Sequence, residues 1–299
     1  MMSKRQHGDR QWLFAPYLLV APVLLYYTMF WLHPVGTALV GSFQDAEAHF
    51  TFANYLTIFR DPVFPRALLN TCAIVAVSVT LEFVVAFGLA LLISKRFAGA
   101  GLFLALALIP MALPPVAVGA IWSSGLASYG WLNSLLTRAG LLEGTEKIAF
   151  LGGGAGRAIV VIVLIDAWQV IPFMMIILLA GMQNLQCELR EAGYVFGGTP
   201  WRVLRSITIP LLRPTIQTAV LLRLISAVQI WLIIVMLYGF RTVPVLLEEV
   251  MFYQEQLTGP EHRRVALAYA VLVAGVVSAI AVAYIRLSTR RDRSTYAAA

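Results

Sequence analysis

Long apolar runs alternate with short polar segments along the whole chain. Each run is long enough to cross a lipid bilayer as a helix, which takes about 20 residues. The pattern predicts six membrane-spanning helices, over residues 12–33, 68–93, 102–126, 158–182, 214–238 and 265–287. We expect the first run to be an uncleaved span, because a signal peptide has a shorter apolar core that ends at a small-residue cleavage site.

The composition agrees with a membrane protein. The chain is 60% hydrophobic and only 12% charged, whereas soluble domains carry about 25% charged residues. Its two cysteines are well separated, Cys72 in an apolar run and Cys187 in a polar loop, which favours neither a disulfide framework nor a metal site. The four histidines are scattered as well, so we expect no bound metal. The expected fold class is an all-α membrane protein.

The basic residues indicate an orientation. A net charge of +7 would suit a nucleic-acid partner, but most Lys and Arg flank the apolar runs on one side, as in membrane proteins with positively charged cytoplasmic loops. We therefore expect no nucleic acid, and both termini in the cytoplasm. The expected division is a cytoplasmic tail over 1–11, a six-helix transmembrane domain over 12–287 that contains a cytoplasmic loop at 183–213, and a cytoplasmic tail over 288–299.

Proline and small residues mark special positions within the spans. The third span holds Pro110, Pro114 and Pro115, and the fourth holds Pro172. Each proline frees backbone groups that neighbours must satisfy, either at a packing kink or at a break that lines a transport pathway. In the sixth span a row of small residues predicts a close helix contact, within the chain or with a second membrane subunit, at Ala266, Ala270, Ala274 and Ser278.

Three charged side chains, Glu82, Asp166 and Arg223, lie inside predicted spans. Each costs about 2.5–3.5 kcal/mol at a helix centre. One hypothesis is an ion pair between Arg223 and either acid, which needs no solute. The other is a polar wall for a hydroxylated solute, because sugars bind to aromatic faces and to planar polar side chains. Spans three to five hold further side chains that suit such a wall or simple packing, namely Trp122, Trp168, Gln169, Ser226, Gln229 and Trp231.

The loop at 183–213 has the pattern of two short helices joined by glycine. One apolar face of the first helix is predicted by the spacing i, i+4, i+7 and i+11 of Leu185, Leu189, Ala192 and Phe196. Asn184 is placed to cap its start, and Gly197-Gly198 to end it.

The second helix of this loop has an equally clear start. Thr199 is placed as its N-cap and Pro200 at its first position. Its apolar face holds Trp201, Leu204 and Thr208, and Pro210 is expected to end it near Ile207. Both apolar faces would lie outside the bilayer, so something must cover them.

These residues resemble a known motif. Glu191-Ala192, Gly197 and the run Ile207-Thr208-Ile209-Pro210 resemble the EAA loop of permease subunits of bacterial ABC importers. Further stretches resemble the carbohydrate-importer permeases in the same order along the chain: Asn54-Tyr55, Phe59, Asp61, Phe64, Ala67-Leu68, Asn70-Thr71, Pro110, Trp122, Trp168, Pro172-Phe173 and Leu179-Ala180-Gly181.

The resemblance implies a coupling role for the loop. In that family the loop docks into a cytoplasmic ATPase, and ATP-driven closure of the ATPase dimer switches the permease between inward-facing and outward-facing states. The implied coupling residues are Leu189, Glu191, Ala192, Phe196, Gly197, Trp201, Leu204, Ile207 and Pro210. The alternative is an amphipathic loop that rests on the membrane surface, although headgroup binding needs no glycine between two capped helices.

The chain also departs from the family pattern. Gly193 replaces the third alanine-type position, and Phe196-Gly197-Gly198 replaces an Asp-Gly-Ala run. These changes leave the coupling role standing. The run 237–244 replaces a threonine-diglycine-proline turn, and Trp231-Leu232 replaces a Phe-Asp pair, which leaves the solute open.

The partners expected from the resemblance are a second homologous permease, an ATPase dimer and an extracytoplasmic solute-binding protein, in a bacterial or archaeal cytoplasmic membrane. This chain has no GxxxxGK[ST] motif for nucleotide, and its only lysines are Lys4, Lys95 and Lys147. ATP and magnesium would therefore bind to the ATPase subunits, and no cofactor to this chain. HExxH, CxxC and GxSxG motifs are also absent, so we expect a transport subunit and no enzyme.

The implied function is to form half of the translocation pathway for a sugar. The pattern of spans four and five resembles permeases for disaccharides such as trehalose or maltose. An importer of glycerol phosphate diesters or another polyol is the nearest alternative. An ion-coupled secondary transporter is the alternative from a different class, and it would transport without an ATPase.

Overall fold

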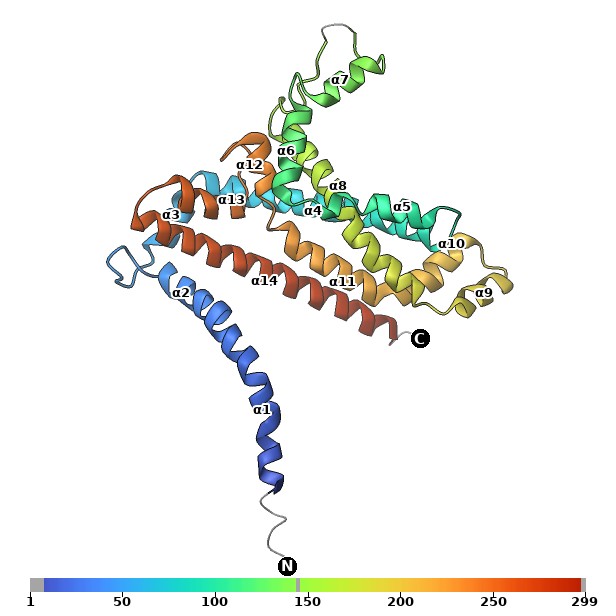
Figure 1. The fold of residues 1–299 in the computed structure, drawn as a ribbon, viewed down its shortest axis with the longest axis horizontal. Coiled ribbons are helices and arrows are strands. Elements are labelled where there is room, and N and C mark those ends of the chain that lie inside the picture. The colour runs from blue at the N-terminus through green and yellow to red at the C-terminus, as the bar shows by residue number, and fades with distance from the viewer. Residues whose placement is uncertain (1–7, 144–145, 297–299) are drawn as a thin grey trace, which may run out of the picture.

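The computed structural model describes residues 8–143 and 146–296, and its described part contains helices and no β-strand (Figure 1). This confirms the all-α prediction for that part. The helices are α1 (Gly8–Tyr27), α2 (His33–Ser42), α3 (Ala53–Arg60), α4 (Val63–Ser94), α5 (Ala100–Ala107), α6 (Pro115–Leu126), α7 (Trp131–Arg138), α8 (Ala155–Gln183), α9 (Cys187–Val195), α10 (Pro200–Val203), α11 (Ile209–Ala227), α12 (Leu232–Tyr238), α13 (Leu246–Met251) and α14 (Pro260–Tyr296). Short π or 3₁₀ turns are η1 (Thr28–Leu32), η2 (Pro110–Ala112), η3 (Leu204–Thr208) and η4 (Phe252–Gln256).

Four helical segments are long and apolar enough to cross a membrane, over Tyr17–Ser42, Val63–Ser94, Ala155–Gln183 and Pro260–Ser288. Two further spans are bent pairs of helices, so the described residues give six spans if each pair counts as one. The first span was predicted to end at residue 33 but continues to Ser42, nine residues further. The π turn η1 lies directly before Pro34 and places this proline in the first turn of α2. Proline is tolerated in a first turn, where the backbone N–H that it lacks is not needed for a helical hydrogen bond. Residues 288–296 continue α14 as helix beyond this span, and residues 1–7 and 297–299 lie outside the described residues.

The third span is broken. The segment Ala100–Ala112 meets Pro115–Leu126 at 94°. Leu113 and Pro114 are extended, with ψ of 133° and 149°, because a residue before proline is pushed out of the helical region. Two consecutive prolines therefore interrupt the helix of the third span completely and do not merely bend it.

The fifth span is longer at its start than predicted and bent near its end. The expectation that Pro210 ends the second loop helix was wrong, since the helix runs from Pro200 to Ala227. The π turn η3 precedes Pro210 and leaves it in the first turn of α11, where its missing N–H is not required. Beyond Ala227 the chain turns through Trp231 and enters α12 at 47° to the preceding helix.

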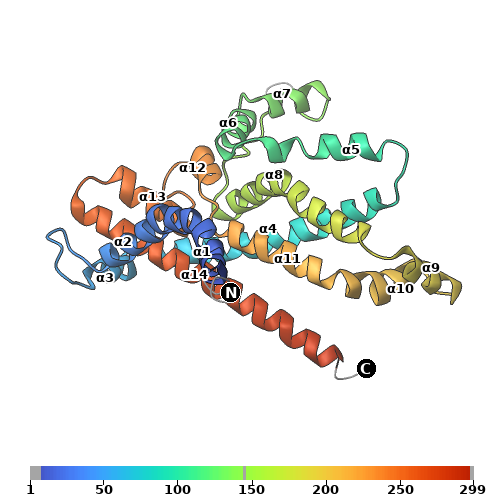
Figure 2. The ribbon, with the colours of Figure 1, turned by 60° about the horizontal axis from the view of Figure 1, so that its bottom comes forward.

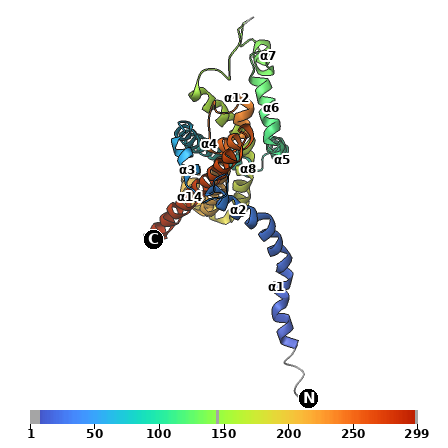
Figure 3. The same ribbon diagram turned by 90° about the vertical axis from the view of Figure 1, so that its left-hand side faces the viewer.

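The first span stands apart from the rest of the molecule (Figures 1 and 3). None of the most apolar part of this span is buried. Side chains such as Leu25, Tyr26 and Phe30 are more than half exposed along it. It is attached at its end, where Asn54 donates to the carbonyls of Ser42 and Gln44 at 2.9 Å each. Lipid or another protein must cover this apolar surface.

The core is built on α4, α8 and α11, which run together in Figure 2. Ala86 and Ala90 of α4 are fully buried against Met174 and Leu178 of α8. Small residues allow such close packing between membrane helices. The predicted row of small residues on α14 becomes more exposed along the helix. Ala266 is buried within the chain, Ala270 is half-buried, and Ala274 and Ser278 are exposed.

A polar network joins the start of α4 to the segment after α12. Arg241 donates to Asp61 at 2.9 Å and to Glu249 at 2.7 Å, and Tyr253 donates to Asp61 at 3.0 Å. Glu248 accepts from the backbone N–H groups of Arg241 and Val245. Burial raises the pKa of the Glu248 carboxyl to about 7. The residues of this polar network are Asp61 and members of the segment 241–253, which lie far apart in the sequence but in contact in the fold.

This network makes stability depend on pH. The ordinary pKa of Glu248 is 4.5 and its folded value is about 7, so the folded protein holds this proton more tightly than the unfolded chain. The stability from Glu248 is full below 4.5 and is lost as pH rises through about 7. We expect the thermal unfolding temperature in nanodiscs to fall over that range. Glu248→Gln should flatten this fall, while Glu255→Gln, at an exposed position nearby, should not. An equal fall in wild type and Glu248→Gln would contradict the assignment.

Candidate solute pathway and coupling loop

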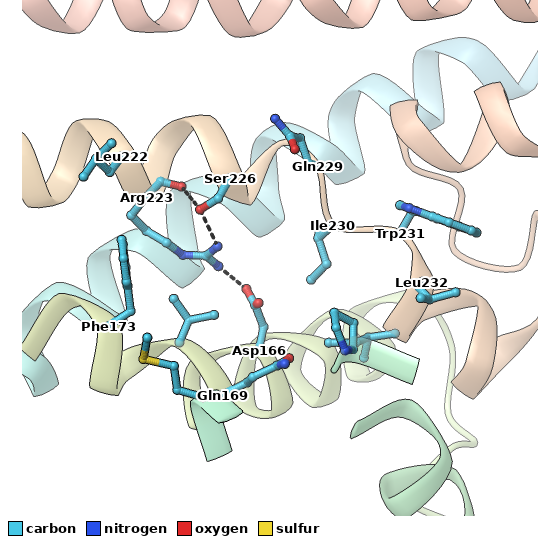
Figure 4. A pocket seen from close by; sticks show the side chains of 14 residues that line it. Asp166, Gln169, Phe173, Leu222, Arg223, Ser226, Gln229, Ile230, Trp231 and Leu232 are labelled. Carbon is cyan, nitrogen blue, oxygen red and sulfur yellow. Dashed lines mark hydrogen bonds and ion pairs between the residues drawn. The ribbon is translucent and has the colours of Figure 1, made fainter. Parts of the chain in front are cut away.

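A cavity of about 500 Å³ lies between the two broken spans and α8. Its wall is mostly apolar, with a few polar side chains that face it together (Figure 4). The lining residues are Met111, Pro115, Asp166, Gln169, Val170, Phe173, Leu222, Arg223, Ser226, Gln229, Ile230, Trp231, Leu232 and Ile233. Six of the nine residues predicted for a pathway are among them: Asp166, Gln169, Arg223, Ser226, Gln229 and Trp231.

Both helix breaks border this cavity. Irregular backbone at membrane depth is tolerated where it is buried in protein or lines a cavity. The side-chain amide of Gln169 donates to the carbonyl of Leu113 at 2.9 Å. One carbonyl freed by the proline break is thus satisfied by a neighbouring helix, as the prolines predict.

The three buried charges form one cluster. Arg223 on α11 pairs with Glu82 on α4, with 2.9 Å between Nη2 and Oε1 and a second contact from Nε. It also pairs with Asp166 on α8 and donates to Ser226 at 3.2 Å. The predicted pairing therefore forms with both acids at once, and it ties the three core helices together. Asp166 and Arg223 border the cavity, whereas Glu82 lies behind them and is fully buried.

Two of the predicted tryptophans do not line the cavity. Trp122 and Trp168 contact each other edge to face with ring centroids 5.6 Å apart, and Trp131 packs on Trp122 at 5.6 Å. The indole N–H of Trp122 is buried without a hydrogen-bond partner among the described residues. The packing interpretation suits this pair better, since the cavity wall takes its tryptophan from Trp231 alone among the described residues.

Sequence reasoning missed the apolar part of the wall. Phe173 lies on α8 with Asp166 and Gln169, at i+7 and i+4 from them, and all three face the cavity. That helical spacing was the available signal. Met111 and Leu222 carried no comparable signal, because the apolar residues of a membrane helix look alike toward lipid and toward a cavity.

The loop at 183–213 folds as two helical arms around Gly197. Gly197 has φ of +78°, which favours glycine, and it follows Phe196, the residue that caps the end of α9. Thr199 caps the second arm by accepting from the amide of Arg202 at 3.3 Å. The cap predicted at Asn184 does not form, because Asn184 still belongs to the end of α8 and α9 begins only after the extended Gln186.

Glycine at 193 allows the two arms to pack. A Cβ there would lie 2.6 Å from Cδ1 of Ile207 and 3.2 Å from Cγ2 of Val203, so an alanine would require the Ile207 side chain to move. The carbonyl of Gly193 accepts from the amide of Gly198 at 2.9 Å. The departure from the family's alanine therefore coincides with close contact between the two arms. Ile207 takes part in this contact, and both Leu204 and Ile207 are half-buried.

The outer surface of the loop exposes large apolar side chains. Phe196 is 89% exposed and Trp201 66% exposed, and Leu189 is 43% exposed. Val195, 84% exposed, belongs to the same surface and was not predicted. The remaining predicted coupling residues are exposed too, at Glu191, Ala192, Gly197 and Pro210. The loop lies at the end of the molecule opposite α3 and α13 (Figure 2).

Comparison with known proteins now decides the family. Residues 83–293 match the family model described as the inner membrane component of binding-protein-dependent transport systems. The chain belongs to this family. Its members are transport components, which agrees with the expectation of a permease subunit without a nucleotide-binding motif.

Several relatives in this family carry names. The trehalose/maltose transport system permease protein MalF of Thermococcus litoralis is 33% identical over 230 residues, 75% of this chain and 76% of that protein. The trehalose transport system permease protein SugA of Mycobacterium tuberculosis is 32% identical over 231 residues, 72% of this chain and 70% of that protein. The sulfoquinovosyl glycerol transport system permease protein SmoG of Agrobacterium fabrum is 32% identical over 230 residues, 74% of this chain and 73% of that protein.

A solved structure shares the fold. A chain of a bacterial ABC transporter involved in the import of the acidic polysaccharide alginate superposes with a TM-score of 0.80 at 22% identity, covering 94% of this chain and 96% of that chain. A second structure of the alginate transporter, in complex with a pentasaccharide-bound periplasmic protein, also gives 0.80, at 23% identity over 96% of this chain and 98% of that chain. Membrane-spanning helices and family membership together make this a multi-pass membrane protein.

The charge cluster predicts an asymmetric response to substitution. Arg223→Met alone leaves two buried carboxylates unpaired, which should cost about 3–5 kcal/mol. The triple variant with Glu82→Leu and Asp166→Leu leaves no unpaired charge, so it should regain most of that stability. Thermal unfolding and monodispersity in detergent measure both. If Arg223→Met alone were as stable as wild type, the role of this cluster in the fold would be contradicted.

Proposed function

We propose that this chain is a permease subunit of an ATP-driven importer and forms half of the translocation pathway for a sugar, with a disaccharide such as trehalose or maltose as the favoured solute. The observation that carries the proposal is the cavity at the two helix breaks, where Gln169, Ser226 and Gln229 offer hydrogen bonds beside the ring of Trp231. Such walls suit a hydroxylated ring. The names of MalF and SugA support the same class of solute.

The loop at 183–213 would dock onto the ATPase. A surface that exposes Phe196, Trp201 and Leu189 outside the membrane core supports a protein partner, because such side chains are normally covered. The fold offers a direct route from this surface to the cavity. One continuous helix from Pro200 to Ala227 carries both the docking residue Trp201 and the cavity residue Arg223. A tilt of the loop would therefore move Arg223, Ser226 and the break that follows them.

Two more partners are proposed. The uncovered first span, attached only at its end, supports a second permease subunit that packs against it. The alginate transporter structure that contains a periplasmic protein supports a solute-binding protein as the third partner. In this arrangement the loop at 183–213 and both termini face the cytoplasm, and α7 and α13 face the other side.

A substitution at Gly197 tests the coupling role. A β-branched residue at its φ of +78° would be strained by about 1–2 kcal/mol or more, so Gly197→Val should lower transport-stimulated ATP hydrolysis about tenfold while the protein still inserts. Gly197→Asn, which tolerates this conformation, should retain more activity. The measurement is ATP hydrolysis by the reconstituted complex with and without loaded binding protein.

A matched control exists for that test. Gly140 has φ of +72° and open space around it, but lies in the loop after α7. Gly140→Val should leave the hydrolysis rate near that of wild type. Equal losses in the two valine variants, or none in Gly197→Val, would reject the loop as the coupling element. Uptake into vesicles without ATP would favour an ion-coupled transporter instead.

The solute class has its own test. We expect neutral disaccharides to raise the thermal unfolding temperature of the cognate solute-binding protein, because this protein selects the solute before the permease meets it. The panel should include trehalose, maltose and a glycerol phosphate diester. A shift with the diester alone would replace the sugar with that polyol derivative.

A further inference from the structure

The cavity wall carries no usable positive charge. Among the described lining residues only Asp166 and Arg223 are charged, and Glu82 completes their cluster from behind. With one guanidinium and two carboxylates, the cluster has a net charge of −1 when all three groups are ionised. With one acid protonated the sum is zero. In neither case does the cluster present a net cation to a solute.

Most of the hydrogen-bonding groups of Arg223 are also occupied. Its Nε and Nη2 donate to Glu82, Nη2 donates to Asp166 as well, and Nη1 donates to Ser226. These contacts use four of its five N–H groups and leave one N–H on Nη1, beside Ser226. A two-point bond from this guanidinium to an anion through Nε and Nη2 would have to displace a buried carboxylate and leave that acid unpaired in a low-dielectric wall, which is costly. Arg223 thus offers a carboxylate, sulfonate or phosphate only its Nη1 side, and its charge is already offset by two carboxylates.

The polar groups that remain are neutral. Gln229 is exposed at the wall, and Gln169 uses one N–H on Leu113, which leaves its oxygen and second N–H. Ser226 is exposed there too, but its hydroxyl already donates to the Arg223 carbonyl at 3.1 Å, so it offers a solute only an acceptor. Amides and hydroxyls both donate and accept, which suits sugar hydroxyls. Nothing among them compensates an anion that has left water.

We propose that the Glu82–Arg223–Asp166 cluster is a charge filter through which the cavity accepts uncharged hydroxylated solutes and rejects anionic ones. This rests on the proposed sugar-import function and specifies it further. Family and fold do not decide the point, since named relatives include a trehalose permease and a permease for a sulfonated glycoside, and the shared fold occurs in an importer of an acidic polysaccharide. The side chains of the cluster decide it.

The test measures binding to the permease itself, apart from the selectivity of a binding protein. The assembled permease–ATPase complex in nanodiscs is equilibrated with labelled trehalose or trehalose 6-phosphate, and bound label is counted. Wild type should prefer trehalose by about tenfold or more, because a phosphate that leaves water finds no net positive charge in this wall to compensate it. The double variant Glu82→Gln with Asp166→Asn keeps acceptors for Arg223 but leaves its charge free, so it should lose or invert that preference.

Two further variants keep the result interpretable. Gln229→Arg adds a cation at an exposed wall position without touching the cluster, so it should bind the phosphate more tightly even if the double variant folds poorly. Glu255→Gln with Glu261→Gln removes the same two charges at exposed positions away from the cavity, and should keep the wild-type preference.

The outcomes separate the filter from the function. Equal binding of both sugars by wild type, or an unchanged preference in Gln229→Arg, overturns the charge filter and leaves sugar import standing. Binding of neither sugar by wild type overturns the proposed solute class and the filter with it. A preference that moves toward the phosphate in the cluster and Gln229 variants, but not in the exposed control, supports the filter.

Discussion

Lipid offers no hydrogen-bond partner, and this constraint shapes the molecule more than any single contact. A helix that crosses the hydrocarbon core can stop being helical only where protein replaces the lost partners. Two of the spans do stop, at Leu113–Pro114 and before Trp231, and both interruptions border the same cavity. Gln169 satisfies one of the freed carbonyls directly. The cavity therefore exists where the backbone is least regular, and the polar side chains that could serve a solute are there for a structural reason as well.

Buried charge follows the same logic. Arg223 is placed where α4, α8 and α11 meet, and each helix contributes one member to its cluster. The cluster stabilises the core only as a complete set, because any member left alone would be an unpaired charge. Under the proposed function, solute selection and folding would share these three side chains. Gln229 carries no charge that needs a partner, whereas Trp231 packs against a core cluster that includes Ile74 of α4 and Ile162 of α8.

Much of this could be predicted from the sequence, and the reason is the same constraint. Uninterrupted apolar runs mark helices, so the second, fourth and sixth spans agree with the structure within about five residues. The pairing of Arg223 was foreseeable because it is the only base among the intramembrane charges. The turn at Gly197 was foreseeable, because glycine at the end of a helix commonly adopts the positive φ that ends it.

Other features depended on information that residue patterns do not carry. The helix continues through Pro210 because a π turn shifts the backbone register just before it, and no residue type announces that turn. The Arg241 network joins Asp61 to Glu249 across most of the chain, so only the tertiary fold brings its members together. Trp122 and Trp168 suit a sugar as well as they suit each other, and packing geometry alone separates the two uses.

The bond between Gln169 and the Leu113 carbonyl has a consequence for hydration. It spans from α8 to the break before α6, so any state that separates these helices must open it. The carbonyl then needs another donor at once, and at that depth only water or a solute hydroxyl can supply one. Opening the space between α6 and α8 therefore requires wetting it. A dry open state would carry the cost of one unpaired carbonyl, about 2–7 kcal/mol.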